Sequence, residues 1–240
     1  MIRMLTLALG LSFAIGCSPV VYKPNRIQVP ELQKKGDLRI GGSIGFDGKN
    51  LQGAYALTDQ LGIMVNAFTF EERSQYDNYL LGGASSIEGG IGYYKAPGPF
   101  IVENYATLAF GSLYARNRNP FTEPYTIDRL DANFFRLALQ SSATLRTNIF
   151  SISAMWRLSQ MHYYNASGNY PLYPNIISEG LKTQNVHYFL EPGFQVSLGF
   201  KYFRCNAQWQ YAMHLGKTWL PYEPYNYSLG MQICIGTKEK

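Results

Sequence analysis

Charged side chains are scarce in this chain, and their scarcity excludes some classes of protein. Asp, Glu, Lys and Arg together make up 15% of the 240 residues, although the net charge is +5. The lysines fall in segments that we interpret as tails, turns and loops, so they form no basic stripe along one face. Because nucleic-acid binding relies on such a stripe, we predict no nucleic-acid partner.

Long apolar runs and catalytic patterns are also lacking. The mostly apolar run at residues 4–15 is far shorter than the roughly 20 residues of a membrane-spanning helix. Among the three histidines, His187 and His214 have no Asp beside them in the sequence, and the nearby carboxylates Glu179 and Glu223 fall in loops. We therefore predict a protein that is not an enzyme and that uses no cofactor.

The sequence is rich in aromatic residues, and apolar and polar side chains alternate strictly in several stretches. There are 19 Tyr, 14 Phe and 3 Trp residues. In residues 186–214, apolar side chains alternate with Gly, Ser, Asn and Gln, and this period of two indicates β-strands. A short turn at Phe200 and Lys201 makes the stretch a hairpin. Because the polar set contains few charges, it suits a crowded barrel interior behind a lipid-facing wall.

About ten strands can be drawn on this pattern. They are residues 37–46, 50–58, 61–70, 85–95, 100–115, 132–146, 149–163, 186–199, 202–214 and 225–236. After the first connection, short and long connections alternate, as in outer-membrane barrels, whose long loops lie outside the cell and whose short turns are periplasmic. We predict a single closed antiparallel transmembrane β-barrel of about ten strands, with eight to twelve possible, apolar outside and polar inside. Both termini are then expected on the periplasmic side.

Aromatic residues also sort by depth in the predicted barrel, which suggests two interfacial girdles. The periplasmic group is Phe100, Phe150, Phe200 and Phe203. The extracellular group is Tyr114, Phe135, Tyr163, Tyr188, Tyr211 and Tyr227.

The chain before the first strand divides into two parts. Residues 1–16 indicate a signal peptide, in which Arg3 precedes the apolar run. Its end, Ala14 to Cys17, resembles the lipobox of bacterial lipoproteins, although Ile15 stands where a small residue is usual. The alternative is an ordinary signal peptide with an incidental cysteine. Residues 17–36, rich in proline, are expected to form an extended tether behind a lipidated Cys17, and residues 37–240 to form the barrel.

Two segments resemble the small outer-membrane β-barrel proteins of Gram-negative bacteria, specifically lipidated members of uncharacterised function. Residues 54–64, AYALTDQLGIM, look like a recurring hairpin of that group, and the resemblance extends from about residue 36 to the end. The last strand, with Ser228, Gly230, Ile233 and Ile235, looks like a barrel-assembly signal, but the chain continues to Lys240 instead of ending on an aromatic residue. The resemblance implies an outer-membrane location, with membrane lipid and the barrel-assembly machinery as partners, and no reaction.

Charged side chains on the predicted inner face fall into two layers. Those near the short turns are Arg39, Glu103 and Arg204, and those about midway are Glu88, Arg136, Arg157 and Glu191. An unpaired charge inside a narrow barrel is prohibitive, so we expect a hydrogen-bonded network that fills the lumen. The alternative is that the same charges line a path for ions or small solutes.

Two further pairs of residues follow from the strand register. His187 should lie opposite His214, near the extracellular mouth, as either a transition-metal site or a polar rim. Because a metal site normally needs a third or fourth ligand, we predict no metal. Cys205 and Cys234 should point to opposite sides of neighbouring strands and remain free thiols.

The sequence leaves three functions open. The first is a non-enzymatic outer-membrane lipoprotein, plugged by its charged side chains, whose long loops supply surface contacts. The second is a narrow channel. The third is a soluble, lipidated, lipocalin-like barrel that binds an apolar ligand, which would require Leu139, Ile152 and Leu198 to point into the lumen.

Overall fold

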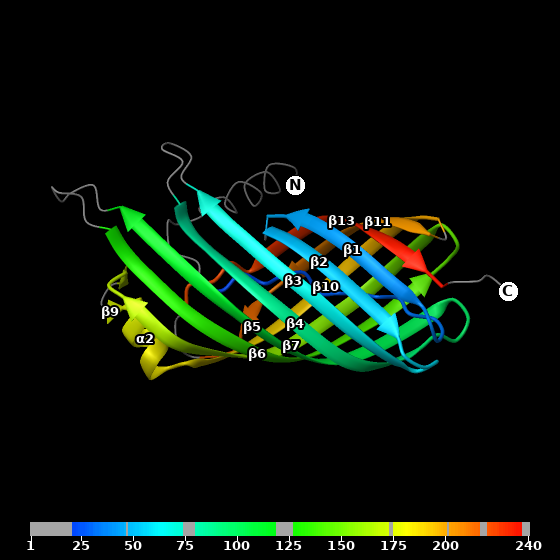
Figure 1. The fold of residues 1–240 in the computed structure, drawn as a ribbon, viewed down its shortest axis with the longest axis horizontal. Coiled ribbons are helices and arrows are strands. Elements are labelled where there is room, and N and C mark those ends of the chain that lie inside the picture. Colours follow the sequence, from blue (N-terminus) through cyan, green and yellow to red (C-terminus); the bar gives the residue numbers. More distant parts are fainter. Residues whose placement is uncertain are drawn as a thin grey trace, which may run out of the picture.

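The computed structural model describes residues 21–46, 48–73, 80–118, 127–172, 175–200, 202–216 and 220–236 (Figure 1). In chain order its elements are β1 (Leu38–Gly45), β2 (Gly48–Ala56), β3 (Leu61–Arg73), β4 (Leu80–Lys95), β5 (Phe100–Arg118), β6 (Ile127–Arg146), β7 (Phe150–Gly168), β8 (Pro171–Leu172), β9 (Asn175–Ile176), α2 (Ile177–Thr183), β10 (Val186–Gly199), β11 (Phe203–Tyr211), β12 (Met213–His214) and β13 (Tyr225–Ile235). Among the described residues, no helix has the length and apolarity needed to span a membrane.

The strands close into one antiparallel barrel. The order around the wall is β11-β13-β1-β2-β3-β4-β5-β6-β7-β10, and β10 pairs back with β11. The short strand β12 continues the pairing along β10, while β8 and β9 form a separate two-stranded sheet. Ten strands therefore make the wall. The predicted fold class, a closed antiparallel barrel of about ten strands, is confirmed.

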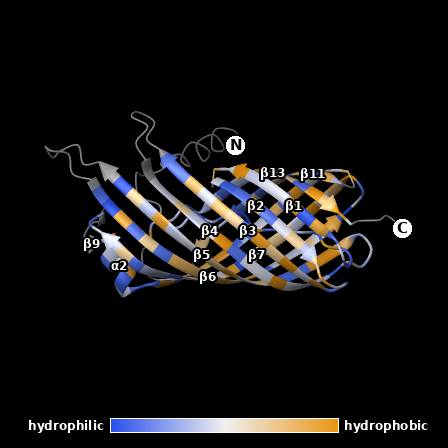
Figure 2. Cartoon of the chain, in the orientation of Figure 1, coloured by the Kyte–Doolittle hydropathy of each residue, from blue (hydrophilic) through white to orange (hydrophobic). Residues whose placement is uncertain are grey.

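The two faces of the wall are sorted as the alternation predicts. Leu139, Ile152 and Leu198 are 56%, 42% and 56% exposed, so they point away from the lumen. Figure 2 shows orange and blue residues alternating along the strands. Cys205 is exposed, Cys234 is buried and both are free thiols, as expected from their opposite faces. The apolar-outside, polar-inside arrangement is confirmed, and it is the reverse of the one that a lipocalin-like barrel requires.

The two ends of the barrel differ. At the short-turn end, the connections at residues 57–60, 96–99 and 147–149, and the connection between β10 and β11, join neighbouring strands. At the long-loop end lie the connections that follow β3, β5, β7 and β12. There β5 and β6 project well beyond β1 and β2 (Figure 1), because β5 has 19 residues and β1 only 8. The rim at the long-loop end is therefore low at β1 and β2.

Residues 21–36, which we call the lumen segment, run through the inside of the barrel (Figure 1, dark blue). The Val21 N–H donates to Pro221 O (2.9 Å) at the long-loop end, and the Gly36 N–H donates to Ala56 O (2.9 Å) at the short-turn end. The sequence predicts an extended tether here, and no local pattern in residues 21–36 places it in the lumen. The chain thus crosses the whole barrel before β1 begins.

Candidate functional site

The wall side chains recognise the main chain of the lumen segment. An extended segment makes no hydrogen bonds within itself to its main-chain carbonyl groups. Inside a barrel these carbonyl groups need hydrogen-bond donors other than bulk water. The wall donors are Asn226 Nδ2 to Pro24 O (2.8 Å), Arg157 Nη2 to Asn25 O (3.0 Å), Gln208 Nε2 to Ile27 O (2.9 Å), Gln140 Nε2 to Gln28 O (3.0 Å) and Arg39 Nη2 to Glu31 O (3.1 Å). They come from β13, β7, β11, β6 and β1, so most of one side of the wall holds the segment. The inner face is rich in amides because it supplies these donors.

The four charges predicted to lie midway form two buried ion pairs, which we call the upper charge cluster. Arg136 Nη2 lies 3.1 Å from Glu88 Oε2, and Arg157 pairs with Glu191 through its Nε atom. All four side chains are at most 4% exposed. Thr107 also donates to Glu88 (2.8 Å). The wall therefore balances its own charge at this depth.

The lumen segment adds uncharged groups to the upper charge cluster. The Tyr22 hydroxyl donates to Glu191, and Asn25 Oδ1 accepts from Arg136 Nη1 (2.8 Å). The segment therefore adds hydrogen-bonding groups to this cluster without adding a charge.

The charges near the short turns are joined by Glu31 of the lumen segment. Glu31 Oε2 lies 3.2 Å from Arg204 Nη1 and 3.5 Å from Arg146 Nη1, and Ser151 donates to Glu31 Oε1 (2.8 Å). Glu103 accepts the main-chain N–H groups of Glu31 (3.0 Å) and Leu32 (3.2 Å). Arg146 and Glu31 were not among the residues that the sequence indicated. One carboxylate of the segment therefore neutralises arginines of the wall.

We call this group the lower charge cluster. Its members are Glu31, Asp37, Arg39, Glu103, Arg146 and Arg204. Glu31 has a φ of +57°, which is uncommon for a residue with a side chain. This conformation lets its N–H group face Glu103 while its carboxylate faces Arg204. The surrounding contacts hold the unfavourable backbone in place.

Between the clusters, the side chains of the segment fill the lumen. Arg26 Nη2 donates to Gln195 Oε1 (2.6 Å) and to Asn206 Oδ1 (2.6 Å), while Ile27 and Val29 pack against Met155. A cavity beside Arg26 has a volume of about 10 Å³. That volume accommodates about one water molecule. The segment and the wall are therefore closely packed at mid-height.

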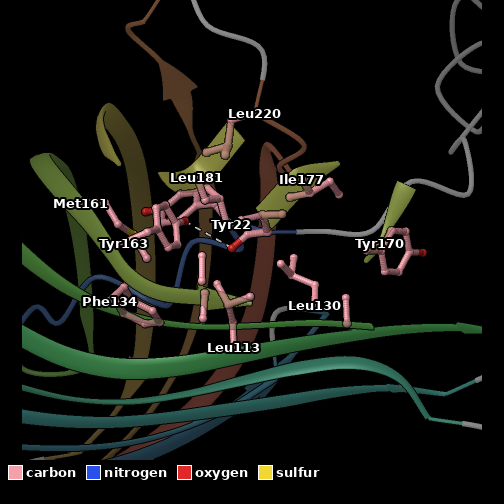
Figure 3. Packing of buried hydrophobic residues seen from close by; sticks show 14 of the residues in the cluster. Tyr22, Leu113, Leu130, Phe134, Met161, Tyr163, Tyr170, Ile177, Leu181 and Leu220 are labelled. Atoms are coloured by element: carbon pink, nitrogen blue, oxygen red, sulfur yellow. Dashed lines mark hydrogen bonds between the residues drawn. The ribbon is translucent and has the colours of Figure 1, made fainter. Parts of the chain in front are cut away.

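A hydrophobic cluster anchors the beginning of the lumen segment at the long-loop end (Figure 3). Tyr22 stacks on Phe189 with ring centroids 3.9 Å apart. Around it lie Leu113, Leu130, Phe134, Tyr163, Leu181 and Leu220. Because these residues come from β5, β6, β7, α2 and the connection before β13, several elements of the long-loop end hold the first residues of the segment. Tyr163 is 1% exposed and faces inward, so assigning it to an outer aromatic girdle was wrong.

His187 and His214 approach each other, but not as the predicted register places them. His214 pairs with Phe189, because the turn closes between Phe200 and Phe203 and not at Phe200 and Lys201. This shifts the register by two residues and keeps both faces unchanged. His187 Nδ1 still lies 3.2 Å from His214 Nε2.

The two imidazoles belong to the aromatic packing around Tyr22. His187 Nε2 lies 2.9 Å from Gln184 O, and the His214 ring packs against Phe189 and Tyr222. In the part of the chain that the structure describes, no three His, Cys, Asp or Glu side chains come together as metal ligands would. The geometry favours the interpretation of this pair as a polar rim.

Comparison with known proteins yields no match, either to a model of a protein family or to a curated protein. The functional argument therefore rests on the geometry of the lumen and of the outer wall.

Proposed function

We propose that this protein is a non-enzymatic outer-membrane β-barrel lipoprotein whose lumen is closed by its own residues 21–36. The observation that carries the proposal is the lumen segment, which is bonded to the wall from Pro24 to Glu31 and leaves little free volume beside it. The proposed closure thus comes from the main chain as well as from the charged side chains. Cys17, the expected lipidation site, lies outside the described residues.

The outer wall supports a location in a membrane. Exposed apolar side chains extend around the barrel, among them Ile40, Leu51, Ile63, Ile87, Leu108, Leu139, Ile152, Leu198 and Leu229. Soluble monomers rarely expose contiguous apolar patches larger than a few hundred Å². A closed barrel also satisfies its main-chain hydrogen bonds without a free edge, as a hydrocarbon environment requires.

Aromatic residues support the position of the membrane boundaries. Phe100, Phe200 and Phe203 are exposed on the outside near the short-turn end, while Tyr188 and Tyr227 are exposed towards the long-loop end. Aromatic girdles of this kind mark the two interfaces of outer-membrane barrels. By analogy with such barrels, we propose that the long-loop end faces the outside of the cell and supplies the surface contacts, to a partner not yet identified.

A narrow channel is the second candidate, because charged side chains line the wall in two layers. It can be tested by replacing residues 22–35 with a Gly and Ser stretch of equal length. Closure by the segment predicts no steady conductance from the wild-type protein in planar bilayers and steady conductance from this variant. A matching replacement of residues 119–126, which leaves the lumen segment intact, should stay closed. Steady conductance from the wild-type protein would instead support the channel.

A further inference from the structure

The contacts of its first residues define the end of the barrel at which the lumen segment begins. Tyr22 forms a parallel bridge with Tyr222, and the Glu223 N–H donates to Tyr22 O (3.0 Å). Lys23 Nζ lies 2.9 Å from the Glu223 carboxylate. The segment therefore begins at the long-loop end, against the connection that precedes β13.

The opposite end of the segment is fixed at the short turns. The Lys35 N–H donates to Asp59 Oδ1 (2.8 Å), and the Gly36 N–H donates to Ala56 O. The strand β1 starts here, and β13 ends beside it, since Leu38 pairs with Ile235. The first strand thus starts and the last strand ends at the short-turn end, while the chain enters the barrel from the long-loop end.

We infer that the chain is threaded through the barrel, so that a lipid on Cys17 inserts into the membrane leaflet at the long-loop end. Only Ser18, Pro19 and Val20 separate Cys17 from Val21. At full extension this distance is about 14 Å, whereas the chain uses residues 21–36 to cross the barrel. A lipid on Cys17 is therefore confined to the side on which Val21 lies.

The shape of the outer wall suits such an anchor. Because the rim is lowest at β1 and β2, an acyl chain that leaves the lumen over these strands has the shortest path to the outer wall. Beside the end of β1, the outer wall has an apolar groove of about 780 Å³ that extends over β10, β11 and β13 and is lined by Ile44, Phe46, Phe194, Val196, Trp209 and Leu229.

This inference rests on the proposed function, in which the long-loop end faces outward, and it identifies the outer leaflet as the partner surface. It replaces the expectation that both termini are periplasmic. The N-terminus of the mature chain is then displayed at the cell surface, and the C-terminus remains on the periplasmic side.

Epitope accessibility on intact cells tests the inference. One epitope is inserted between Ser18 and Pro19, a second replaces residues 119–126, and a third follows Lys240. We expect antibody binding to the first two on intact cells, and to the third only after permeabilisation. An N-terminal epitope that behaves like the C-terminal one, while the loop epitope is accessible, would overturn the threading. If the loop epitope is also hidden, the proposed orientation fails instead.

Cross-linking in detergent tests the threading independently of the membrane. In a Cys205→Ser background, a short bis-maleimide should link Lys23→Cys to Glu223→Cys at least ten-fold more than Lys23→Cys to Asp59→Cys. The first pair lies together at the long-loop end, and Asp59 lies at the other end. The reverse preference, or no link in either labelled variant, would contradict the threaded arrangement.

Discussion

In the upper charge cluster each buried carboxylate is paired with an arginine of the wall, whereas in the lower cluster the carboxylate that pairs with Arg204 belongs to the lumen segment. The upper cluster has two arginines and two glutamates without any charge from the segment. The lower cluster has three arginines, Arg39, Arg146 and Arg204, and three carboxylates, Asp37, Glu103 and Glu31. Without Glu31 it carries one excess positive charge.

This difference assigns the clusters different physical roles. A buried charge that loses its partner is strongly destabilising. Loss of an upper arginine therefore affects the barrel wall itself, while loss of Glu31 affects mainly the docking of the segment. Both clusters bond to the segment, the upper one through uncharged groups of Tyr22 and Asn25. Only the lower cluster depends on the segment, through Glu31, for its charge balance.

The largest effect is expected from Arg157→Ala, which leaves the Glu191 carboxylate buried without its arginine. We expect the free energy of unfolding to fall by about 3–5 kcal/mol, measured by urea unfolding in lipid vesicles. The control is Arg129→Ala: Arg129 is 62% exposed and pairs with Asp131 at 2.5 Å. An exposed pair contributes about 0–1 kcal/mol. Equal losses in both variants would contradict a dry upper cluster.

The next largest effect is expected from Glu31→Ala, and it should appear in the segment. Loss of the hydrogen bonds to Arg204 and Ser151 should weaken docking by about 1.5–3 kcal/mol. Hydrogen exchange of the Leu32 amide, which donates to Glu103, should then accelerate by roughly ten- to hundred-fold. The control is Lys35→Ala, at an exposed position. If Glu31→Ala lowers the free energy of barrel unfolding as much as it lowers the free energy of segment docking, the two clusters do not act independently.

A double-mutant cycle sharpens the comparison. Glu31→Ala combined with Arg204→Ala should show a coupling energy of about 1–3 kcal/mol, because the two side chains are in contact. Glu31→Ala combined with Arg157→Ala should be additive within about 0.5 kcal/mol, because these residues belong to different clusters. In both cycles, the quantity to be measured is the free energy with which the segment docks in the barrel. Strong coupling in the second cycle would indicate one continuous network.

The sequence predicts the barrel wall well because inward-facing and outward-facing side chains alternate along each strand with a period of two residues. Strand alternation places Glu88, Arg136, Arg157 and Glu191 on one face, and counting from the turns places them at one depth, where the structure pairs them. The same alternation continues from Arg136 to Arg146, so Arg146 was also recognisable as inward-facing. A buried charge requires an oppositely charged partner, but the alternation does not identify which residue that partner is.

The lumen segment has no such signal. Residues 21–36 have no alternation, and their contacts lie far away in the sequence, so no local pattern indicates that they enter the barrel. The indirect signal is the amide-rich inner face, where Gln140, Gln208 and Asn226 offer donors to an extended main chain.

The register error at the histidines has a different cause. A shift of one residue reverses the two faces of a strand, whereas a shift of two leaves them unchanged. Alternation therefore fixes which way His187 and His214 point but not which residues are opposite each other. The position of the turn, closed between Phe200 and Phe203, decides the register.

The smallest effect is expected from Gln208→Met, which keeps the length of the side chain and removes one donor to the lumen segment. Gln208 Nε2 donates to Ile27 O at 2.9 Å, midway between the two clusters. A neutral hydrogen bond of this kind contributes about 0.5–1.5 kcal/mol, less than either charged contact. Exchange of the segment amides should accelerate by up to roughly ten-fold, with unfolding of the barrel unchanged. Gln140→Met, which removes the equivalent bond to Gln28 O (3.0 Å), should give the same result. If neither substitution accelerates exchange, the clusters alone hold the segment, and the amides of the inner face contribute only to packing.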